Sequence, residues 1–238
     1  MVSYSARRYL VLVGLVILFW LGSILTEYLT SRPDPIYRHG DESRPVVALT
    51  FDDGPSSRFT PQILALLKNY QIHATFFLLG RHARRYPQVV QALAAQGHEI
   101  GNHTYSHLRL AKVNQATLAR EMDQTEAVLG QLGARLNGLF RPPYSELSQA
   151  AVGYLKRTGR KIILWNVDSG DWRGYPATTI VARVLNNLKN GAIVVLHDNN
   201  EYDNANRQPT VDALRLLLPQ MQKKGFRCLT VSELLKIY

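Results

Sequence analysis

The sequence is poor in cysteine, in repeats and in low-complexity stretches. Its 238 residues contain a single cysteine, Cys228, so no internal disulfide can form. No segment repeats at a solenoid-like period, and no run interleaves arginine with aromatic residues as nucleic-acid readers do. These absences exclude a disulfide framework and a repeat architecture. Cys228 lies in a strand-like run, residues 226–230, and is predicted to be structural and buried rather than nucleophilic.

The composition instead indicates a packed domain with a basic surface. Hydrophobic residues make up 46% of the chain and charged residues 19%, which argues against disorder. The length suits one domain plus a short appendage. The net charge is +10, of which residues 1–30 supply +1 and the remainder +9. Such a surface favours polyanions such as nucleic acid, anionic lipid or an anionic wall polymer, although a solvated excess of Lys and Arg is equally consistent.

Residues 9–25 form the one long apolar run. These 17 residues carry no charge, which is near the lower limit for spanning a bilayer. Arg7 and Arg8 precede the run and Glu27 follows it, so the carboxy-terminal bulk should lie outside. A cleaved signal peptide is the alternative, but the exit reads GSILT and lacks a small-x-small site. We therefore expect a single-pass anchor within residues 1–29, in the cell membrane, and a polar linker at residues 30–44.

From residue 45 onward, apolar strand-like runs alternate with helical patterns. The alternation predicts an α/β fold with a parallel sheet covered by helices, and about seven such units suggest a distorted or incomplete (β/α) barrel. The predicted strands are residues 46–51, 74–79, 99–102, 138–141, 161–167, 191–196 and 226–230. The predicted helices are residues 61–70, 87–96, 114–132, 148–158, 178–188 and 211–224.

Polar residues gather at the carboxyl ends of these strands, where barrel enzymes keep their chemistry. His103 and His107 are four apart and can converge on one ion if the stretch turns helically. Asp53, which follows the first strand, would complete a set of two imidazoles and one carboxylate with an open position for water. We therefore predict a catalytic metal site formed by these three residues.

Five more residues at the strand ends are candidates for transferring protons or for orienting the groups that do so. Asp52 can accept a proton from an activated water, and Arg141 can hold Asp52 ionised. His197 leaves the sixth strand and suits a general acid near neutral pH. Either Asp171 or Asp168 could orient His197 and raise its pKa.

Five blocks of sequence together resemble the polysaccharide deacetylases of carbohydrate esterase family four, the NodB-homology domain. The blocks are TFDDGP at residues 50–55, HTYSH at 103–107, RPPY at 141–144, DSGDW at 168–172 and VLH at 195–197. The last block has Val195 where the family usually has Leu. The resemblance spans about residues 46–235, and it identifies residues 45–238 as a catalytic domain of this type.

The resemblance implies hydrolysis of an acetamide on a sugar, with Zn²⁺ or another divalent ion held by Asp53, His103 and His107. It makes Asp52 the base, Arg141 its orienting partner, and His197 the acid, tuned by Asp171. The backbone N–H of Tyr144 would bind the oxyanion. Trp172 and Val195 would line the pocket for the acetyl methyl group.

The expected substrate is a cell-wall or related polysaccharide such as peptidoglycan or a chitin-like polymer of N-acetylglucosamine. An enzyme that removes O-acetyl groups from a glycan is the nearest alternative. An anchored, non-catalytic glycan-binding protein is the alternative from another class, although every catalytic position is filled. We expect neither a nucleic-acid partner nor a protein partner.

Overall fold

A computed structural model describes residues 12–24 and 35–237, which belong to two separate units, Met1–Asp34 and Pro35–Tyr238. In the first unit, residues 12–24 form a helix whose large apolar side chains are exposed. No helix in the described part of the chain is both long and apolar enough to cross a membrane. The anchor predicted at residues 9–25 extends at both ends into residues that lie outside the described ranges.

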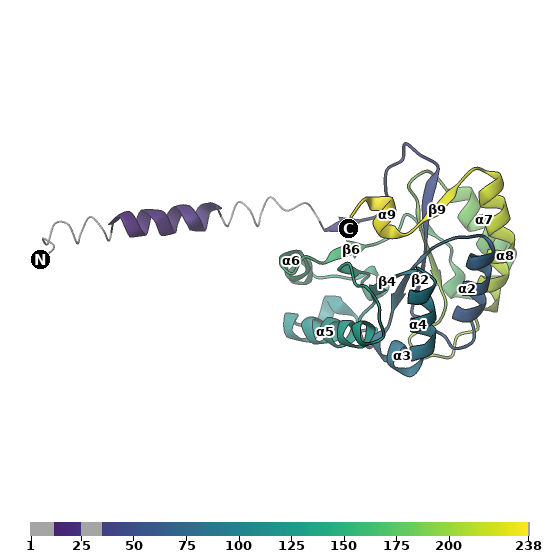
Figure 1. Cartoon of the computed structure of the whole chain (residues 1–238), viewed down its shortest axis with the longest axis horizontal. Coiled ribbons are helices and arrows are strands. Elements are labelled where there is room, and N and C mark those ends of the chain that lie inside the picture. Colours follow the sequence, from purple (N-terminus) through teal and green to yellow (C-terminus); the bar gives the residue numbers. More distant parts are fainter. Residues whose placement is uncertain (1–11, 25–34, 238) are drawn as a thin grey trace, which may run out of the picture. The chain divides into compact units, whose positions relative to one another are not determined.

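The second unit is built on a parallel sheet, as the sequence predicts (Figure 1). Along the sheet the order is β1-β6-β5-β4-β3-β2-β8-β7, and β9 also pairs with β2. The strands are β1 (Ile36–Tyr37), β2 (Val46–Asp52), β3 (Thr75–Leu78), β4 (Glu99–Asn102), β5 (Leu139–Phe140), β6 (Lys161–Ile163), β7 (Val167–Asp168), β8 (Ile193–His197) and β9 (Arg227–Leu229). All of the paired strands run parallel.

The strand predicted at residues 161–167 is in fact two strands. β6 pairs with β5 and β1 near one end of the sheet, whereas β7 pairs with β8 at the other end. Only residues 164–166 separate the two strands, and the four Cα–Cα steps from Ile163 to Val167 reach at most about 14 Å. The chain therefore draws the two ends of the sheet together, and the sheet curls into a half-barrel.

Part of the predicted linker is ordered against this sheet. β1 lies within residues 30–44 and adds to the exposed edge of β6, where the Ile162 N–H donates to the carbonyl of Pro35 at 2.6 Å. His39 forms an antiparallel bridge with Ala192. An edge strand presents unpaired backbone groups, and β1 satisfies those of β6.

The predicted helices are all present, with ends within three residues of the prediction, and they cover the sheet in a continuous series. Neighbouring pairs in contact are α7 with α8, α8 with α2, α2 with α4, α4 with α3, α3 with α5, and α5 with α6 (Figure 1). The helices are α2 (Thr60–Asn69), α3 (Gly80–Arg85), α4 (Pro87–Ala95), α5 (Gln115–Gln131), α6 (Gln149–Arg157), α7 (Ala177–Asn187), α8 (Gln208–Lys223) and α9 (Val231–Leu235). The sequence did not predict α3 and α9, which have only six and five residues.

Side chains cap the starts of several helices. Asn114 accepts the N–H of Thr117 at the start of α5, and Ser148 accepts that of Ala151 at the start of α6. Each cap satisfies a donor that has no partner within the helix. These caps fix the helix starts, and thereby where α5 presents its side chains to the strand ends.

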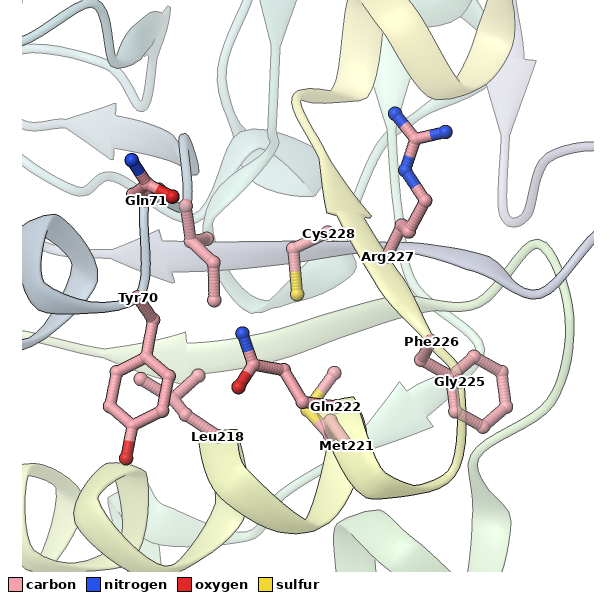
Figure 2. Close-up of a pocket in the computed structure, with 10 residues that line it drawn as sticks. Tyr70, Gln71, Leu218, Met221, Gln222, Gly225, Phe226, Arg227 and Cys228 are labelled. Atoms are coloured by element: carbon pink, nitrogen blue, oxygen red, sulfur yellow. The ribbon is translucent and has the colours of Figure 1, made fainter.

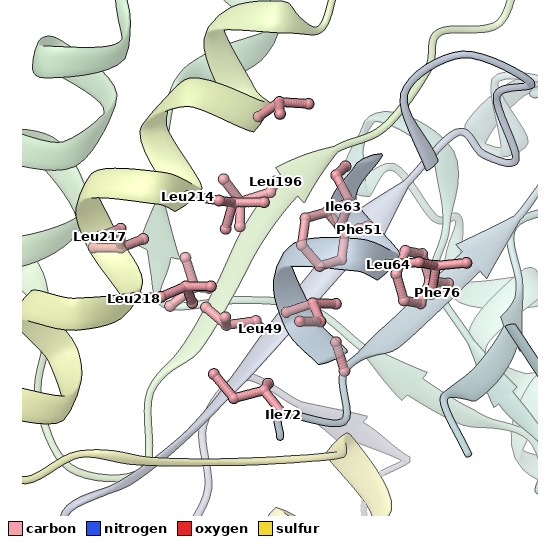
Figure 3. Packing of buried hydrophobic residues seen from close by; sticks show 14 of the residues in the cluster. Leu49, Phe51, Ile63, Leu64, Ile72, Phe76, Leu196, Leu214, Leu217 and Leu218 are labelled. Atoms are coloured by element: carbon pink, nitrogen blue, oxygen red, sulfur yellow. The ribbon is translucent and has the colours of Figure 1, made fainter. Parts of the chain in front are cut away.

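Strand β2 is buried on both faces, which accounts for its nearly continuous apolar sequence. Leu49 and Phe51 pack outward with α2 and α8, beside residues such as Ile63 and Leu214 (Figure 3). The side chain of Ala48 points to the opposite face of β2 and packs in a second hydrophobic cluster inside the curl of the sheet. β2 is therefore packed on both faces, and this packing fixes the position of the residues that follow it.

A pocket of about 370 Å³ is lined by residues at the end of α2, in α8 and in β9 (Figure 2). Tyr70 at the end of α2, Met221 in α8 and Phe226 line it, together with Cys228 in β9. Burial raises the pKa of the Cys228 thiol to about 12. The thiol is therefore protonated at neutral pH, in keeping with a structural cysteine, although the residue is half-buried.

Candidate active site

The polar residues singled out in the sequence meet at the carboxyl edge of the sheet. Asp52 ends β2 and His197 ends β8, and the two are register partners on adjacent strands. His103 directly follows β4, and Arg141 directly follows β5. Because the strands are parallel and adjacent, their carboxyl ends bring these side chains to one place.

Asp53, His103 and His107 form one compact cluster. Asp53 Oδ1 lies 3.4 Å from Nε2 of His103 and 3.2 Å from Nε2 of His107. One possible ligand atom from each residue lies within 4.8 Å of the others. Burial tends to raise the pKa of Asp53, but the two imidazoles facing it hold that pKa well below its usual value. The carboxylate is therefore ionised and can serve as a ligand.

The segment between His103 and His107 is not helical. A spacing of four residues suggested that a helical turn would bring the two imidazoles together. Thr104 and His107 have φ angles of 70° and 63°, which no right-handed helix contains. The His107 N–H donates to the hydroxyl of Thr104, which closes a tight loop. Two left-handed residues, rather than a helical turn, therefore aim both imidazoles at Asp53.

The cluster fits a divalent metal ion. Bond lengths of about 2.0–2.2 Å at tetrahedral angles place two ligand atoms roughly 3.3 Å apart, close to the separations found here. Asp53 Oδ1 is buried and has no hydrogen-bond partner. The Nδ1 atom of His103 donates to the Arg141 carbonyl at 2.7 Å, which leaves Nε2 free to coordinate. Three protein ligands of this kind leave a position for water.

Arg141 is fully buried and lies beside Asp52. Its Nη1 donates to Asp52 Oδ1 at 2.7 Å and to the hydroxyl of Thr50 at the same distance. Nε and Nη2 donate to the carbonyls of Ile163 and Leu164. The guanidinium is thus tied to β2 and β6, and it presents one charge-assisted hydrogen bond to the candidate base.

His197 is bound to Asp171, not to Asp168. Its Nδ1 lies 2.8 Å from Asp171 Oδ1. Burial acts to lower the pKa of His197, but Asp171 and the nearby carboxylates outweigh burial and raise that pKa to about 9. Asp168 instead accepts the N–H of Gly170 and lies near Arg183. Of the two acids considered from the sequence, Asp171 is the one placed to orient His197.

The three residues expected to contact substrate occupy different environments. Tyr144 is 42% exposed, has a φ of 57°, and its ring packs edge-on against His107 at 4.6 Å. Trp172 is 52% exposed, and the guanidinium of Arg173 lies over its ring. Val195 is buried in β8 beside β2 and β7. Tyr144 thus adjoins the cluster of Asp53, His103 and His107, whereas no direct contact joins Trp172 or Val195 to that cluster among the contacts found in residues 35–237.

Sequence reasoning missed several buried polar residues around the site. His82, in the unpredicted helix α3, binds the carbonyl of Asp53 through Nδ1 at 2.8 Å. Asp198 accepts a hydrogen bond from Thr60, and burial raises its pKa to about 7. Glu121 of α5 binds the loop between the histidines. In the sequence Glu121 is recognisable only as a polar residue within a predicted helix, and no motif spacing connects it with the site.

Comparison with known proteins agrees with this geometry. The model of the polysaccharide deacetylase family matches residues 39–163. A peptidoglycan-N-acetylglucosamine deacetylase of Bacillus cereus is 40% identical over 195 residues, which cover 82% of this chain and 70% of that protein. A chitooligosaccharide deacetylase of a Bradyrhizobium species is 33% identical over 79% of this chain and 90% of its own.

A solved structure shows the same likeness in three dimensions. The crystal structure of a peptidoglycan N-acetylglucosamine deacetylase, in complex with 4-naphthalen-1-yl-N-oxidanyl-benzamide, superposes with a TM-score of 0.82 at 38% identity. The match covers 86% of this chain and 94% of the other. The chain therefore belongs to the polysaccharide deacetylase family of enzymes, carbohydrate esterase family four.

Proposed function

We propose that this enzyme is a metal-dependent hydrolase that removes N-acetyl groups from a cell-wall polysaccharide, with peptidoglycan as its substrate. The observation that carries the proposal is the open Asp53–His103–His107 cluster, which has the geometry of a three-ligand metal site. Asp52 and His197 lie on adjacent strand ends beside it. A metal site flanked by a candidate base and a candidate acid suits hydrolysis of an amide.

In this proposal Asp53, His103 and His107 hold Zn²⁺ or another divalent ion. When bound, such an ion supplies Lewis-acid chemistry, because it acidifies water to a pKa of about 7 and polarises a carbonyl. Asp52, oriented by its hydrogen bond from Arg141, takes one proton from the attacking water as the C–O bond forms. The Tyr144 N–H donates to the oxygen on which negative charge develops.

His197 completes the reaction as the acid. The C–N bond of the tetrahedral intermediate breaks as His197 gives its proton to the sugar nitrogen, so that acetate and a free amine leave. A pKa of about 9 keeps this imidazole protonated at neutral pH. Amide nitrogen needs a proton to depart more than an ester oxygen does, so a protonated His197 favours N-deacetylation over the alternative of O-deacetylation.

Peptidoglycan is preferred as the substrate because of the similarity to the Bacillus cereus enzyme and the basic charge of the chain. The net charge of +10 suits an anionic wall. We also propose that residues 9–25 anchor the enzyme in the cell membrane with the catalytic unit outside. The uncharged apolar run, the preceding Arg7 and Arg8, and the exposed apolar side chains of residues 12–24 support this location.

Acetate release from three polymers tests the proposal directly. Peptidoglycan, chitooligosaccharide and acetylxylan are compared with and without a chelator. We expect release from peptidoglycan that is lost with chelator and restored by Zn²⁺. Preference for acetylxylan would favour the O-acetyl esterase. Binding to glycan without acetate release, under every metal condition, would favour the non-catalytic alternative.

The Asp52→Asn variant tests the base. It keeps the shape of the side chain but removes its basicity, so turnover should fall by about 10²–10⁴-fold while metal still binds. Asp168→Asn is a matched control, since Asp168 has no direct contact with Asp52 among the contacts found in residues 35–237. Full activity of Asp52→Asn would remove Asp52 from the mechanism.

A further inference from the structure

We propose that Glu121 is a positioning residue for the metal site. Glu121 lies on helix α5, 14 residues beyond His107, and it falls within none of the five sequence blocks that resemble the family. Its carboxylate holds the loop between His103 and His107 in the conformation that turns both imidazoles toward Asp53. The inference rests on the proposed metal dependence and adds a residue to it.

The contacts of Glu121 are directed at the two residues between the histidines. Oε2 accepts the backbone N–H of Tyr105 at 3.0 Å and that of Ser106 at 2.8 Å. Oε1 accepts the Ser106 hydroxyl at 2.9 Å. The side chain is buried, with 7% exposure. Successive backbone N–H groups often form a concave nest that binds an anion. Here the anion is a buried carboxylate of the protein itself, and it accepts three hydrogen bonds from two adjacent residues.

Each of the five backbone N–H groups of residues 103–107 has a hydrogen-bond acceptor, and for two of them that acceptor is Glu121. His103 donates to the Leu78 carbonyl, Thr104 to Asn102 Oδ1, Tyr105 and Ser106 to Glu121, and His107 to the Thr104 hydroxyl. The Thr104 and Tyr105 carbonyls accept the N–H groups of Gly80 and Arg81. Without the carboxylate, two backbone donors of half-buried residues at the centre of the loop would lose their partner.

The loop needs this support because its backbone is strained. Thr104 and His107 both have positive φ angles, a conformation that is unfavourable for residues other than glycine. Hydrogen bonds to a charged acceptor are stronger than neutral ones and can offset that cost. The relaxed alternative, with φ negative at either residue, would turn an imidazole away from Asp53.

Helix α5 is a firm support for the carboxylate. Leu118 and Met122, on either side of Glu121, are buried in the same hydrophobic cluster. The carbonyl of Met122 also accepts the side-chain amide of Asn102, whose Oδ1 binds Thr104. The helix therefore fixes the loop at two points, directly through Glu121 and indirectly through Asn102.

The Glu121→Gln variant, compared with Asp123→Asn, tests the proposal. Both substitutions remove one negative charge from α5, but Asp123 is exposed and lies off the loop. We expect Glu121→Gln to bind Zn²⁺ about 10-fold more weakly, because a neutral amide oxygen accepts the N–H groups of Tyr105 and Ser106 less strongly than a carboxylate does, and the loop that carries the ligands is then held less firmly. Affinity is measured by competition with a chromophoric chelator, well below the melting temperature. Asp123→Asn should bind Zn²⁺ like the unaltered protein.

Excess metal separates positioning from general destabilisation. If Glu121 positions the ligands, acetate release by Glu121→Gln at low Zn²⁺ is reduced, and saturating Zn²⁺ restores kcat. Unchanged Zn²⁺ affinity in Glu121→Gln would overturn the proposal and leave the metal-dependent mechanism intact. Failure of the unaltered protein to bind Zn²⁺ would instead overturn both.

Amide hydrogen exchange provides a measurement that needs no variant. In the metal-free protein the N–H groups of Tyr105 and Ser106 should exchange slowly, because they are bonded to a buried carboxylate. The exposed turn residue Tyr202 is the comparison. If Tyr105 and Ser106 exchange as fast as Tyr202, Glu121 does not hold the loop, and this result does not depend on whether Glu121→Gln folds.

Discussion

The carboxylate of Asp171 binds His197 twice, through the imidazole and through the backbone. Oδ1 lies 2.8 Å from Nδ1, and Oδ2 accepts the His197 N–H at 2.8 Å. Thr210 donates to Oδ2 and Ser169 to Oδ1, so the carboxylate cannot rotate away. His197 is therefore held in one orientation, with Nε2 left for the substrate.

This pair predicts how the metal-free protein responds to pH. The pKa of His197 is about 9 in the fold against 6.5 for an ordinary histidine, so the pair stabilises the fold fully below pH 6.5. That stabilisation is lost as pH rises through 9. In Asp171→Asn the imidazole loses the strongest of the influences that raise its pKa, so that pKa should fall from about 9 towards its ordinary value. NMR titration of the His197 ring checks this, with Asp168→Asn as the control that keeps the high pKa.

The buried Arg141–Asp52 pair predicts strong coupling in stability. Arg141→Met leaves the Asp52 carboxylate buried without its partner, and should lower the free energy of unfolding by about 3–5 kcal/mol. The same change made in Asp52→Asn should cost less, because no charge is left unpaired. Urea unfolding of the four proteins gives the coupling. Additive effects would mean that the pair contributes no specific interaction.

Gly54 leaves room for Asp198, and alanine there should be harmful. A Cβ at Gly54 would collide with the Asp198 carboxylate, which Thr60 holds in place. We expect Gly54→Ala to destabilise the protein by about 1–3 kcal/mol, and Asp198→Ala to relieve part of that loss in the double variant. Gly130→Ala is the matched control. A Cβ at that α5 position meets no atom within 4 Å, so it should stabilise by up to about 1 kcal/mol. Equal melting temperatures for the two alanine variants would contradict this.

Zn²⁺ should raise the melting temperature, because it binds the folded protein only. At 100 times the dissociation constant the gain in stability is about 2.7 kcal/mol. His107→Ala should abolish the rise. It removes a ligand, and the Nδ1 atom of His107 has no hydrogen-bond partner to lose. The exposed His39→Ala variant should keep the rise. An unchanged melting temperature of the unaltered protein with Zn²⁺ would exclude the proposed site.

The strands and the gathering of polar residues at their carboxyl ends could be predicted from sequence, because both follow from local patterns. β2 is apolar along nearly its whole length, and Asp52 and Asp53 follow it directly. The break between β6 and β7 could not be predicted. Residues 161–167 read as one strand, and only the curl of the sheet sends the two halves to opposite ends.

The support of the site was also hidden from the sequence. Glu121 and Asn102 act on the histidine loop from separate elements, and their contacts depend on how α5 packs. The spacing of His103 and His107 suggested a helical turn, whereas two residues with positive φ angles join them. Neither threonine nor histidine signals such a conformation as glycine would.

Arg141 links the two halves of the site through a single residue. Its carbonyl receives the Nδ1–H of His103, and its guanidinium holds Asp52. A displacement of the backbone at this residue therefore moves His103 and Asp52 together. Engineering that aims to shift Asp52 relative to His103 must first separate these two attachments, for instance by giving His103 another acceptor. We therefore expect substitutions in β2 and in the histidine loop to have non-additive effects, and we expect that non-additivity to depend on the residue at position 141.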